Sequence, residues 1–165
     1  MSNKIVLDLT KVFADEGGSV KFCKECDMDS GLLPYPNAQL KKVELDLTAQ
    51  FIKPNVRVAG KIVCHIDGFC DKCLAKVAKA EVLDFDQIFY KDSSDEEDAY
   101  VYFDSMLDIT KALSDEIALS LPTSWLCSDD CKGLCPKCGV NLNEQLCDCN
   151  TSRENAFSVL KNIKF

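Results

Sequence analysis

The chain has 165 residues, 47% of them hydrophobic, which is enough for one folded domain with a core and a small appendage. No apolar run is long enough to span a bilayer and the first residues lack a signal-peptide pattern, so we expect a cytoplasmic protein without a membrane segment. The net charge of −8 argues against nucleic-acid binding through a general excess of Lys and Arg. Eleven cysteines in a reducing compartment indicate metal or redox chemistry rather than a disulfide framework.

Much of the chain up to about residue 103 has the pattern of β-strands. Apolar residues alternate with period two from Val43 to Phe51, which is typical of a half-buried strand. β-Branched and aromatic residues continue through the next segments, with Gly60 as a bulge or bend. We therefore predict strands, arranged mainly as an antiparallel meander or an open barrel, at residues 4–13, 20–22, 40–52, 55–66, 74–90 and 100–103.

Two helices are predicted after the strands. Apolar residues recur at every fourth position from Ile109 to Leu121, which gives one apolar stripe. Asp108 can cap the N-terminus of this helix, and Pro122 ends it. A second, short helix is predicted at residues 155–164.

Charged residues gather in a few short segments. Residues 92–98 include five acids, which predicts an exposed loop, with attraction of a basic partner as the alternative. The lysine-rich segments are residues 41–42, 72–79 and 161–164. Each is modest, and a solvated surface explains each of them equally well.

These patterns predict an α+β fold, with a body of mainly antiparallel β-sheet or open barrel, one or two helices and a C-terminal cysteine-rich zinc module. We expect the β-rich body to cover residues 1–122, including a helix at about residues 109–121. The zinc-binding module and the C-terminal helix would then occupy residues 123–165.

The C-terminal module carries six cysteines within a short stretch. Cys135 and Cys138, with Pro136 between them and Gly139 after them, have the spacing of a metal-binding knuckle. We predict one structural zinc ion held by these two thiolates and two others. Two metals with bridging sulfurs, or an iron–sulfur cluster, are the alternatives. Two nearby pairs could supply the other two ligands, namely Cys127 with Cys131 and Cys147 with Cys149. Either one whole pair or one cysteine from each pair would complete the site.

Two further Cys-x-x-Cys pairs lie outside this module. Cys23 and Cys26 form one pair, and Cys70 and Cys73 form the other. Two such pairs far apart in sequence often supply a four-thiolate zinc site, so we predict a second site from these four residues. The alternative is a redox dithiol at Cys70 and Cys73, which would favour a helix after the motif, whereas the sequence continues as a strand.

No catalytic constellation is visible in the sequence. There is no nucleophile elbow, phosphate loop, dinucleotide fingerprint or His-Glu-x-x-His motif. A Cys–His pair would have to use His65, the single histidine, and nothing marks a nucleophile for it. We therefore expect a protein that is not an enzyme.

Several segments together resemble the YceD family, the large-ribosomal-RNA accumulation proteins of bacteria and plastids. Residues 70–74 match its central Cys-x-Arg-Cys-Leu pattern, with Lys72 in place of the usual Arg. The cysteine-rich tail resembles the tail of many members. The pair Cys23 and Cys26 and the extra Cys64 are not features of the family. The remaining similar segments are residues 108–110, 115–122, 127–143, 147–149 and 155–161.

The resemblance implies a non-enzymatic role in the synthesis, processing or stability of large-subunit ribosomal RNA. The expected partner is the large-subunit precursor, contacted through a basic ribosomal protein or through the RNA itself. The acidic composition favours the first route. The alternatives from other classes are the thiol-redox protein described above and a zinc-ribbon adaptor for transcription or translation.

Overall fold

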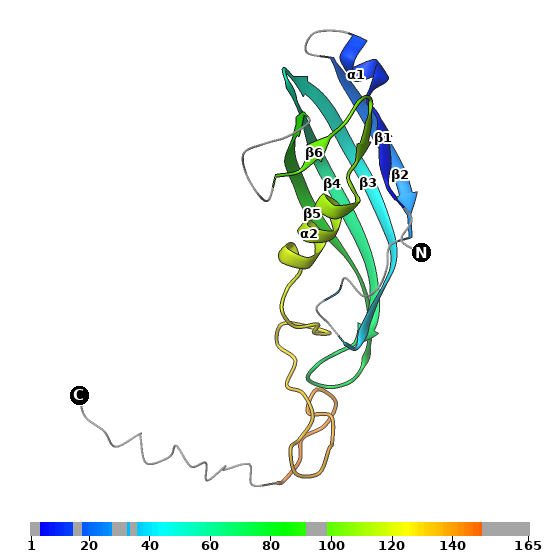
Figure 1. Ribbon diagram of the computed structural model, residues 1–165. Helices are drawn as coiled ribbons and strands as arrows, with labels where there is room; N and C mark the ends of the chain where they lie inside the picture. Colours follow the sequence, from blue (N-terminus) through cyan, green and yellow to red (C-terminus); the bar gives the residue numbers. More distant parts are fainter. Residues whose placement is uncertain (1–3, 15–17, 28–32, 34–35, 92–98, 150–165) are drawn as a thin grey trace, which may run out of the picture.

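The computed structural model describes residues 4–14, 18–27, 33, 36–91 and 99–149. Its main element is a five-stranded sheet in the order β2-β3-β4-β5-β6 (Figure 1). Neighbouring strands are antiparallel except for β5 and β6, which are parallel. The strands are β2 (Ser19–Cys26), β3 (Ala38–Ile52), β4 (Asn55–Phe69), β5 (Lys76–Lys91) and β6 (Val101–Tyr102).

A short two-stranded ribbon lies on one face of this curved sheet (Figure 1). It pairs β1 (Val6–Asp8) with β7 (Met106–Asp108) in antiparallel register. Each ribbon strand leads into a helix, β1 into α1 (Thr10–Ala14) and β7 into α2 (Thr110–Ser120). The same local bond starts both helices, because an aspartate two residues earlier accepts a hydrogen bond from the N–H of each threonine.

The core lies between the sheet and this layer of ribbon and helices. Alternate residues of β3 and β4 are buried, as the period of two requires, and they pack with Phe85 and Phe89 of β5. The buried face of α2 contributes Leu113 and Ile117. The opposite face of the sheet carries cross-strand ion pairs such as Arg57–Asp86 and is exposed.

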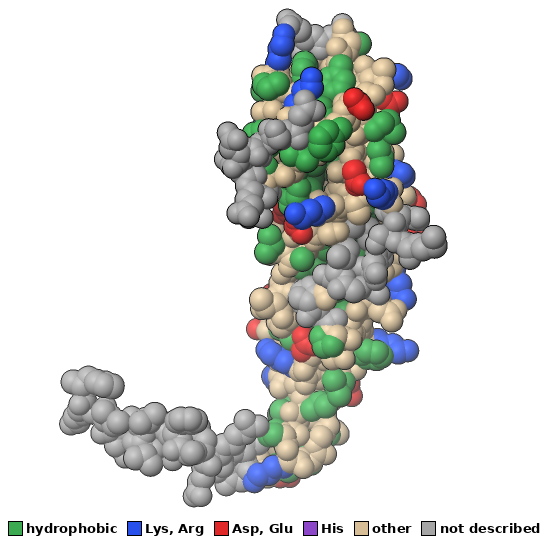
Figure 2. Space-filling model, viewed as in Figure 1, with side chains coloured by type: hydrophobic (Ala, Val, Ile, Leu, Met, Phe, Trp, Pro, Cys, Tyr) green, Lys and Arg blue, Asp and Glu red, His purple; other side chains and the backbone are tan. Residues whose placement is uncertain are grey.

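The face viewed in Figure 2 has Lys and Arg side chains interspersed with Asp and Glu. Apolar side chains are also exposed on that face. Among the exposed apolar residues, Phe103 and Met106 lie opposite each other in a β-bridge. Within the described residues, none of the helices has the length and apolar character needed to cross a membrane.

The predicted class, mainly antiparallel sheet with helices, is confirmed. The helix predicted near residues 109–121 is α2, although Ile109 rather than Asp108 occupies the cap position. The strand predicted at residues 4–13 is wrong beyond Asp8, because the Asp8 carboxylate binds the N–H and hydroxyl of Thr10 and starts α1. The loop predicted at residues 92–98 and the helix predicted at 155–164 lie outside the described residues.

Candidate metal centre

The cysteines of the described chain form two groups of four that can each hold a metal ion. Within each group all sulfur atoms lie within 4.8 Å of one another. We call Cys70, Cys73, Cys127 and Cys131 the junction site, because it joins the β4–β5 connection to the chain after α2. We call Cys135, Cys138, Cys147 and Cys149 the tail site.

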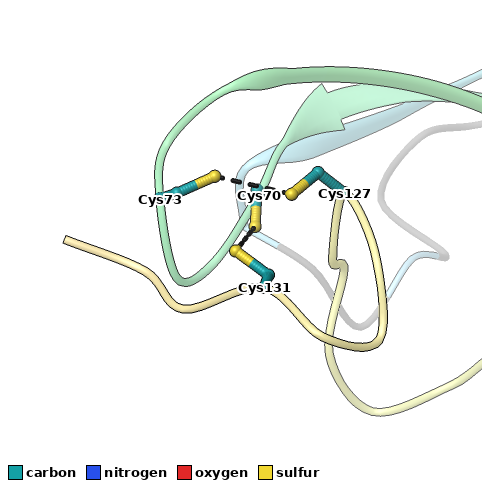
Figure 3. A group of neighbouring side chains, drawn as sticks. All are labelled: Cys70, Cys73, Cys127 and Cys131. Atoms are coloured by element: carbon teal, nitrogen blue, oxygen red, sulfur yellow. Dashed lines mark hydrogen bonds between the residues drawn. The ribbon is translucent and has the colours of Figure 1, made fainter. Parts of the chain in front are cut away.

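The junction site is compact, and its four sulfur atoms point toward one another (Figure 3). The Sγ atoms of Cys70 and Cys131 are 3.8 Å apart, and those of Cys73 and Cys127 are 3.6 Å apart. Four sulfurs placed tetrahedrally about 2.3 Å from a zinc ion would be separated by about 3.8 Å, whereas a disulfide needs about 2.05 Å. The spacing therefore fits one tetrahedral ion and no disulfide.

The same knuckle geometry begins both sites. In the junction site the N–H of Cys70 donates to the carbonyl of Ala75 (2.9 Å), and the N–H of Leu74 donates to the carbonyl of Cys70 (2.9 Å). In the tail site the N–H of Cys135 donates to Val140 (2.8 Å), and that of Gly139 donates back to Cys135 (2.9 Å). The residue after each knuckle has a positive φ, 59° at Leu74 and 74° at Gly139.

Backbone N–H groups stabilise the first thiolate of the junction site. Burial opposes its ionisation, but bonds from the N–H groups of Cys127, Cys73 and Lys72 lower the pKa of Cys70 to about 6. The N–H of Ala75 favours ionisation of Cys73, yet burial and the neighbouring thiols raise the pKa of Cys73 to about 12. Because four adjacent thiols cannot all ionise by themselves, the site requires a cation to become a set of four thiolates.

The tail site shows the same contrast in a more exposed setting. Backbone N–H groups of Cys138 and Lys137 lower the pKa of Cys135 to about 6. The neighbouring Cys138 thiol raises the pKa of Cys149 to about 12, and burial adds to this effect. Cys135 is buried, Cys138 is exposed, and the other two are half-buried. Solvent therefore reaches this site more easily than the junction site, where three cysteines are buried.

The donor set narrows the choice of metal. Four thiolates are soft ligands, which suit zinc or iron rather than magnesium or calcium. An iron–sulfur cluster places several iron atoms between its cysteine sulfurs, and sulfurs within 4.8 Å of one another fit a single ion better. With four protein ligands each site is closed, which is the arrangement of structural rather than catalytic metal centres.

Backbone contacts hold the two halves of the junction site together. The N–H of Trp125 donates to the Asp71 carboxylate (2.7 Å), and the N–H of Asp71 donates to the Trp125 carbonyl (2.9 Å). The N–H of Leu134 donates to the carbonyl of Lys72 (3.0 Å). Trp125 is buried, and the ammonium of Lys79 lies 5.7 Å from the centre of its ring. The segment after α2 is thus attached to the sheet next to the cysteines of the junction site.

Asn143 is a residue that sequence reasoning did not identify. Its amide nitrogen donates to the sulfur of Cys131 (3.4 Å), and its amide oxygen accepts from the N–H of Lys132 (2.8 Å). Asn143 lies in the loop between ligands of the tail site, so it connects the two sites directly. Its only signal in the sequence is its position within the cysteine-rich segment.

The structure groups the cysteines differently from the sequence prediction. One predicted combination for the C-terminal module is present, namely the group of Cys135, Cys138, Cys147 and Cys149. The other two cysteines of the module, Cys127 and Cys131, instead join Cys70 and Cys73. The predicted grouping of Cys23 and Cys26 with Cys70 and Cys73 does not form.

Strand geometry explains the position of Cys23 and Cys26. Both lie in β2, where residues three apart point to opposite faces of the sheet. The Cys23 sulfur lies 3.7 Å from the Asp46 carboxylate, and the Cys26 sulfur lies 3.8 Å from the Val43 carbonyl. Cys64 is buried in β4, and burial raises its pKa to about 11.

Two other candidates have different surroundings from those a redox or catalytic site needs. The Cys70–Cys73 knuckle leads into β5 rather than into the helix typical of a redox dithiol, and the N–H groups that lower the pKa of Cys70 belong to the knuckle and to Cys127. His65 lies on the exposed face, where its Nε2 is 3.0 Å from the Glu44 carboxylate. It belongs to neither of the two metal groups found in the described chain.

Comparison with known proteins gives a consistent result. Residues 58–164 match the family described as "Large ribosomal RNA subunit accumulation protein YceD". An uncharacterized protein of Mycobacterium tuberculosis is 30% identical over 106 residues, covering 61% of this chain and 51% of that protein. No solved structure matches.

Plant relatives carry a functional name. The Arabidopsis thaliana protein "Large ribosomal RNA subunit accumulation protein YCED homolog 1, chloroplastic" is 30% identical over 163 residues, covering 79% of this chain and 50% of its own length. The Zea mays protein of the same name is 28% identical over 121 residues, covering 73% of this chain and 34% of its own length. The chain thus spans about half the length of the Mycobacterium tuberculosis and Arabidopsis thaliana relatives. The match across residues 58–164, which includes every cysteine of both candidate sites, shows that this chain belongs to the YceD family.

Proposed function

We propose that this chain is a non-enzymatic factor in the accumulation of large-subunit ribosomal RNA. The observation that carries the proposal is the family match across residues 58–164. The named plant relatives support the same role. The role covers synthesis, processing or stability of the RNA, and the proposed place of action is the cytoplasm, in association with the large-subunit precursor.

Each four-cysteine site holds one structural zinc ion in this proposal. Three observations support this part of the proposal. Non-bonded sulfur atoms of the junction site lie close together, and backbone N–H groups bond to the first cysteine of each knuckle. Four cysteines in each group would also give a closed ligand set. The tail segment has little apolar material of its own, so metal binding would supply much of its folding free energy. Zinc in the junction site would attach the predicted module at residues 123–165 to the predicted body at residues 1–122.

A closed site also supports a role without catalysis. A zinc ion with four protein ligands has no open position for water or substrate. A redox role for Cys70 and Cys73 would require those thiolates to be released from the metal first. In this proposal the protein therefore acts on the precursor by binding, without a catalytic step of its own.

The test is depletion of the protein in its own organism, followed by measurement of both ribosomal RNAs. We expect the large-subunit RNA to fall relative to the small-subunit RNA, and large-subunit particles to decrease in a sucrose gradient. Wild-type protein and the Cys23→Ser variant should restore the RNA, because Cys23 lies outside both metal groups. Unchanged ribosomal RNA ratios and particle profiles after depletion would contradict the proposal.

A further inference from the structure

A hollow of about 620 Å³ lies where β3, β4 and β5 approach the junction site. It is lined by exposed side chains of these strands and of the residues just before β3, namely Asn37, Gln39, Lys41, Asp67, Phe69 and Lys76. Its volume is in the range of sites that accept a ligand the size of one nucleotide. Two of the three lysine-rich segments of the sequence, residues 41–42 and 72–79, each contribute one lysine to this hollow.

The lysines of the hollow differ from several other cations of the sheet in having no acidic partner within the described chain. Lys21, Lys61 and Arg57 each form an ion pair with an aspartate on a neighbouring strand. Among the described residues, Lys41 and Lys76 form no ion pair, and Lys41 instead donates to the side-chain oxygen of Gln39 (2.9 Å). Both ammonium groups are therefore available to an anionic ligand, and Asp67 is the one acid in the lining.

Phe69 provides an aromatic surface in the same hollow. Its side chain is 45% exposed, although the next residue, Cys70, is completely buried. Its backbone is held by pairing with Lys76 and by a bond from its N–H to the Asn37 carbonyl (3.1 Å). An exposed aromatic ring on a fixed strand next to cations is the arrangement on which proteins stack unpaired bases.

A second hollow on the same sheet provides a contrast. It has about 530 Å³, and its lining includes Glu25, Glu44 and Asp46 together with Lys24, Lys61 and Val82. Its three carboxylates outnumber its two lysines, whereas in the first hollow two lysines outnumber one aspartate, and its lining includes no aromatic residue. Size alone therefore does not distinguish the two hollows, whereas charge and the aromatic ring do.

We propose that the hollow at Phe69 binds a single-stranded segment of RNA. A base would stack on the Phe69 ring, the amides of Asn37 and Gln39 would bond to base edges, and Lys41 and Lys76 would contact phosphates. This inference rests on the proposed function and assigns to it a direct RNA contact, despite the overall charge of −8. The binding is thus local, and it does not depend on a general excess of positive charge.

The test uses the full chain loaded with metal and a short fluorescein-labelled single-stranded RNA, followed by anisotropy. We expect Phe69→Ala to weaken binding about tenfold or more, because stacking on an aromatic side chain is lost. The double variant Lys41→Gln/Lys76→Gln should reduce the slope of log affinity against log salt by about 1.4, since two phosphate contacts disappear. The matched control in the second hollow, Lys61→Gln/Val82→Ala, should bind within about twofold of wild type.

Three results would overturn this inference. One is wild-type protein that does not bind the RNA, and another is unchanged affinity in variants whose metal content and melting temperature equal those of wild type. The third is preference for an acidic peptide over the RNA, which would identify the hollow as a protein-binding site.

Complementation separates this inference from the proposed function. Rescue of ribosomal RNA by a Phe69→Ala variant that no longer binds RNA would overturn the assigned contact and leave the function intact. RNA binding at this hollow by a protein whose depletion leaves ribosomal RNA unchanged would support the contact and contradict the function.

Discussion

The two candidate metal sites use the same knuckle and differ in where their other cysteines originate. The tail site takes all four cysteines from residues 135–149, whereas the junction site combines Cys70 and Cys73 with two cysteines more than fifty positions later. Three of the junction cysteines are buried, while in the tail site only Cys135 is buried. A local motif can thus close a small loop in one place and fasten two parts of a fold in another.

The largest expected effects come from removing one ligand of each site. Cys70→Ser should lower the free energy of unfolding by about 4 kcal/mol or more, because both metal binding and the attachment of the chain after α2 are lost. Cys138→Ser should lower the stability of the body by less than about 1 kcal/mol, since its site is local. Denaturant unfolding followed by tryptophan fluorescence measures these free energies of unfolding. Trp125 is a suitable probe, because it is the single tryptophan and lies beside the junction site.

Cys23→Ser is the control for these variants and should leave the unfolding curve unchanged. Equal destabilisation by the Cys70 and Cys138 substitutions would remove the distinction between a fastening site and a local one.

Replacement of Trp125 should be nearly as costly. Trp125→Ala would leave a cavity at a fully buried position and is expected to cost about 3–5 kcal/mol, measured by calorimetry. Trp125→Phe should cost less, because it retains part of the ring. The backbone bonds to Asp71 do not require the indole, so the variant should still bind two zinc ions, with weaker binding at the junction site. A loss of less than about 1 kcal/mol would show that the contact with the body does not depend on this side chain.

Two glycines provide a smaller, matched comparison. Gly133 and Gly139 have similar positive φ values, 75° and 74°, so alanine at either position should cost about 1–2 kcal/mol in backbone strain. A Cβ at Gly133 would lie 3.0 Å from the Lys72 carbonyl oxygen, while nothing lies within 4 Å of one at Gly139. Gly133→Ala should therefore be the more destabilising and should weaken zinc at the junction site, as measured by chelator competition. Equal destabilisation by the two substitutions would contradict the close contact between Gly133 and Lys72.

The strand and helix patterns were largely predictable from sequence, because alternation and the four-residue repeat are local properties. The tail site was also visible, since its ligands lie close together in the chain. The partners of Cys70 and Cys73 depend on how the chain after α2 packs, which no local pattern reports. A usable signal was present, because each site combines one Cys-x-x-Cys knuckle with one pair of a different spacing, Cys127/Cys131 or Cys147/Cys149.

The pair Cys23 and Cys26 shows the limit of spacing as evidence. Spacing predicts a knuckle only where the chain can turn, and these residues belong to a strand paired with β3 along its whole length. A strand was predicted at residues 20–22, but the polar and charged residues that follow concealed its continuation to Cys26.

Leu74 tests the knuckle at the scale of about 1 kcal/mol. It has the positive φ that Gly139 has in the tail site, and its side chain is 58% exposed. Leu74→Gly should therefore be more stable than Leu74→Ala by about 1 kcal/mol, because only glycine relieves the strain and little packing is lost in either. Thermal unfolding of the two variants measures the difference. A more stable alanine variant would contradict the shared backbone geometry of the knuckles.

The smallest effect concerns the body and its dependence on pH. Burial raises the pKa of Asp108, but hydrogen bonds from Thr110 and the charge of Lys4 lower it more. The pKa of Asp108 in the folded protein is therefore below its ordinary value of 3.8. A lowered pKa stabilises the fold above the ordinary value, and this contribution is lost as the pH falls through the folded-state pKa. Asp108→Asn should cost less than about 1 kcal/mol at neutral pH, because the carboxylate is partly exposed.

Urea unfolding at several pH values checks this prediction. The difference between wild type and Asp108→Asn should shrink as the pH falls below the ordinary pKa of 3.8 and through the lowered folded-state pKa of Asp108. A difference that is constant with pH would show that the Asp108 charge does not stabilise the start of α2.

The central claim is that eight cysteines bind two separate zinc ions and that the other three of the eleven do not. The most direct measurement is elemental analysis of protein purified without added metal, combined with alkylation of native protein and mapping of the modified residues by mass spectrometry. We predict two zinc ions per chain, rapid alkylation of exposed Cys23, slow alkylation of Cys26 and Cys64, and protection of the other eight until a chelator is added. One zinc ion or none, with Cys70, Cys73, Cys127 and Cys131 freely alkylated in the folded protein, would contradict the junction site and the account built on it.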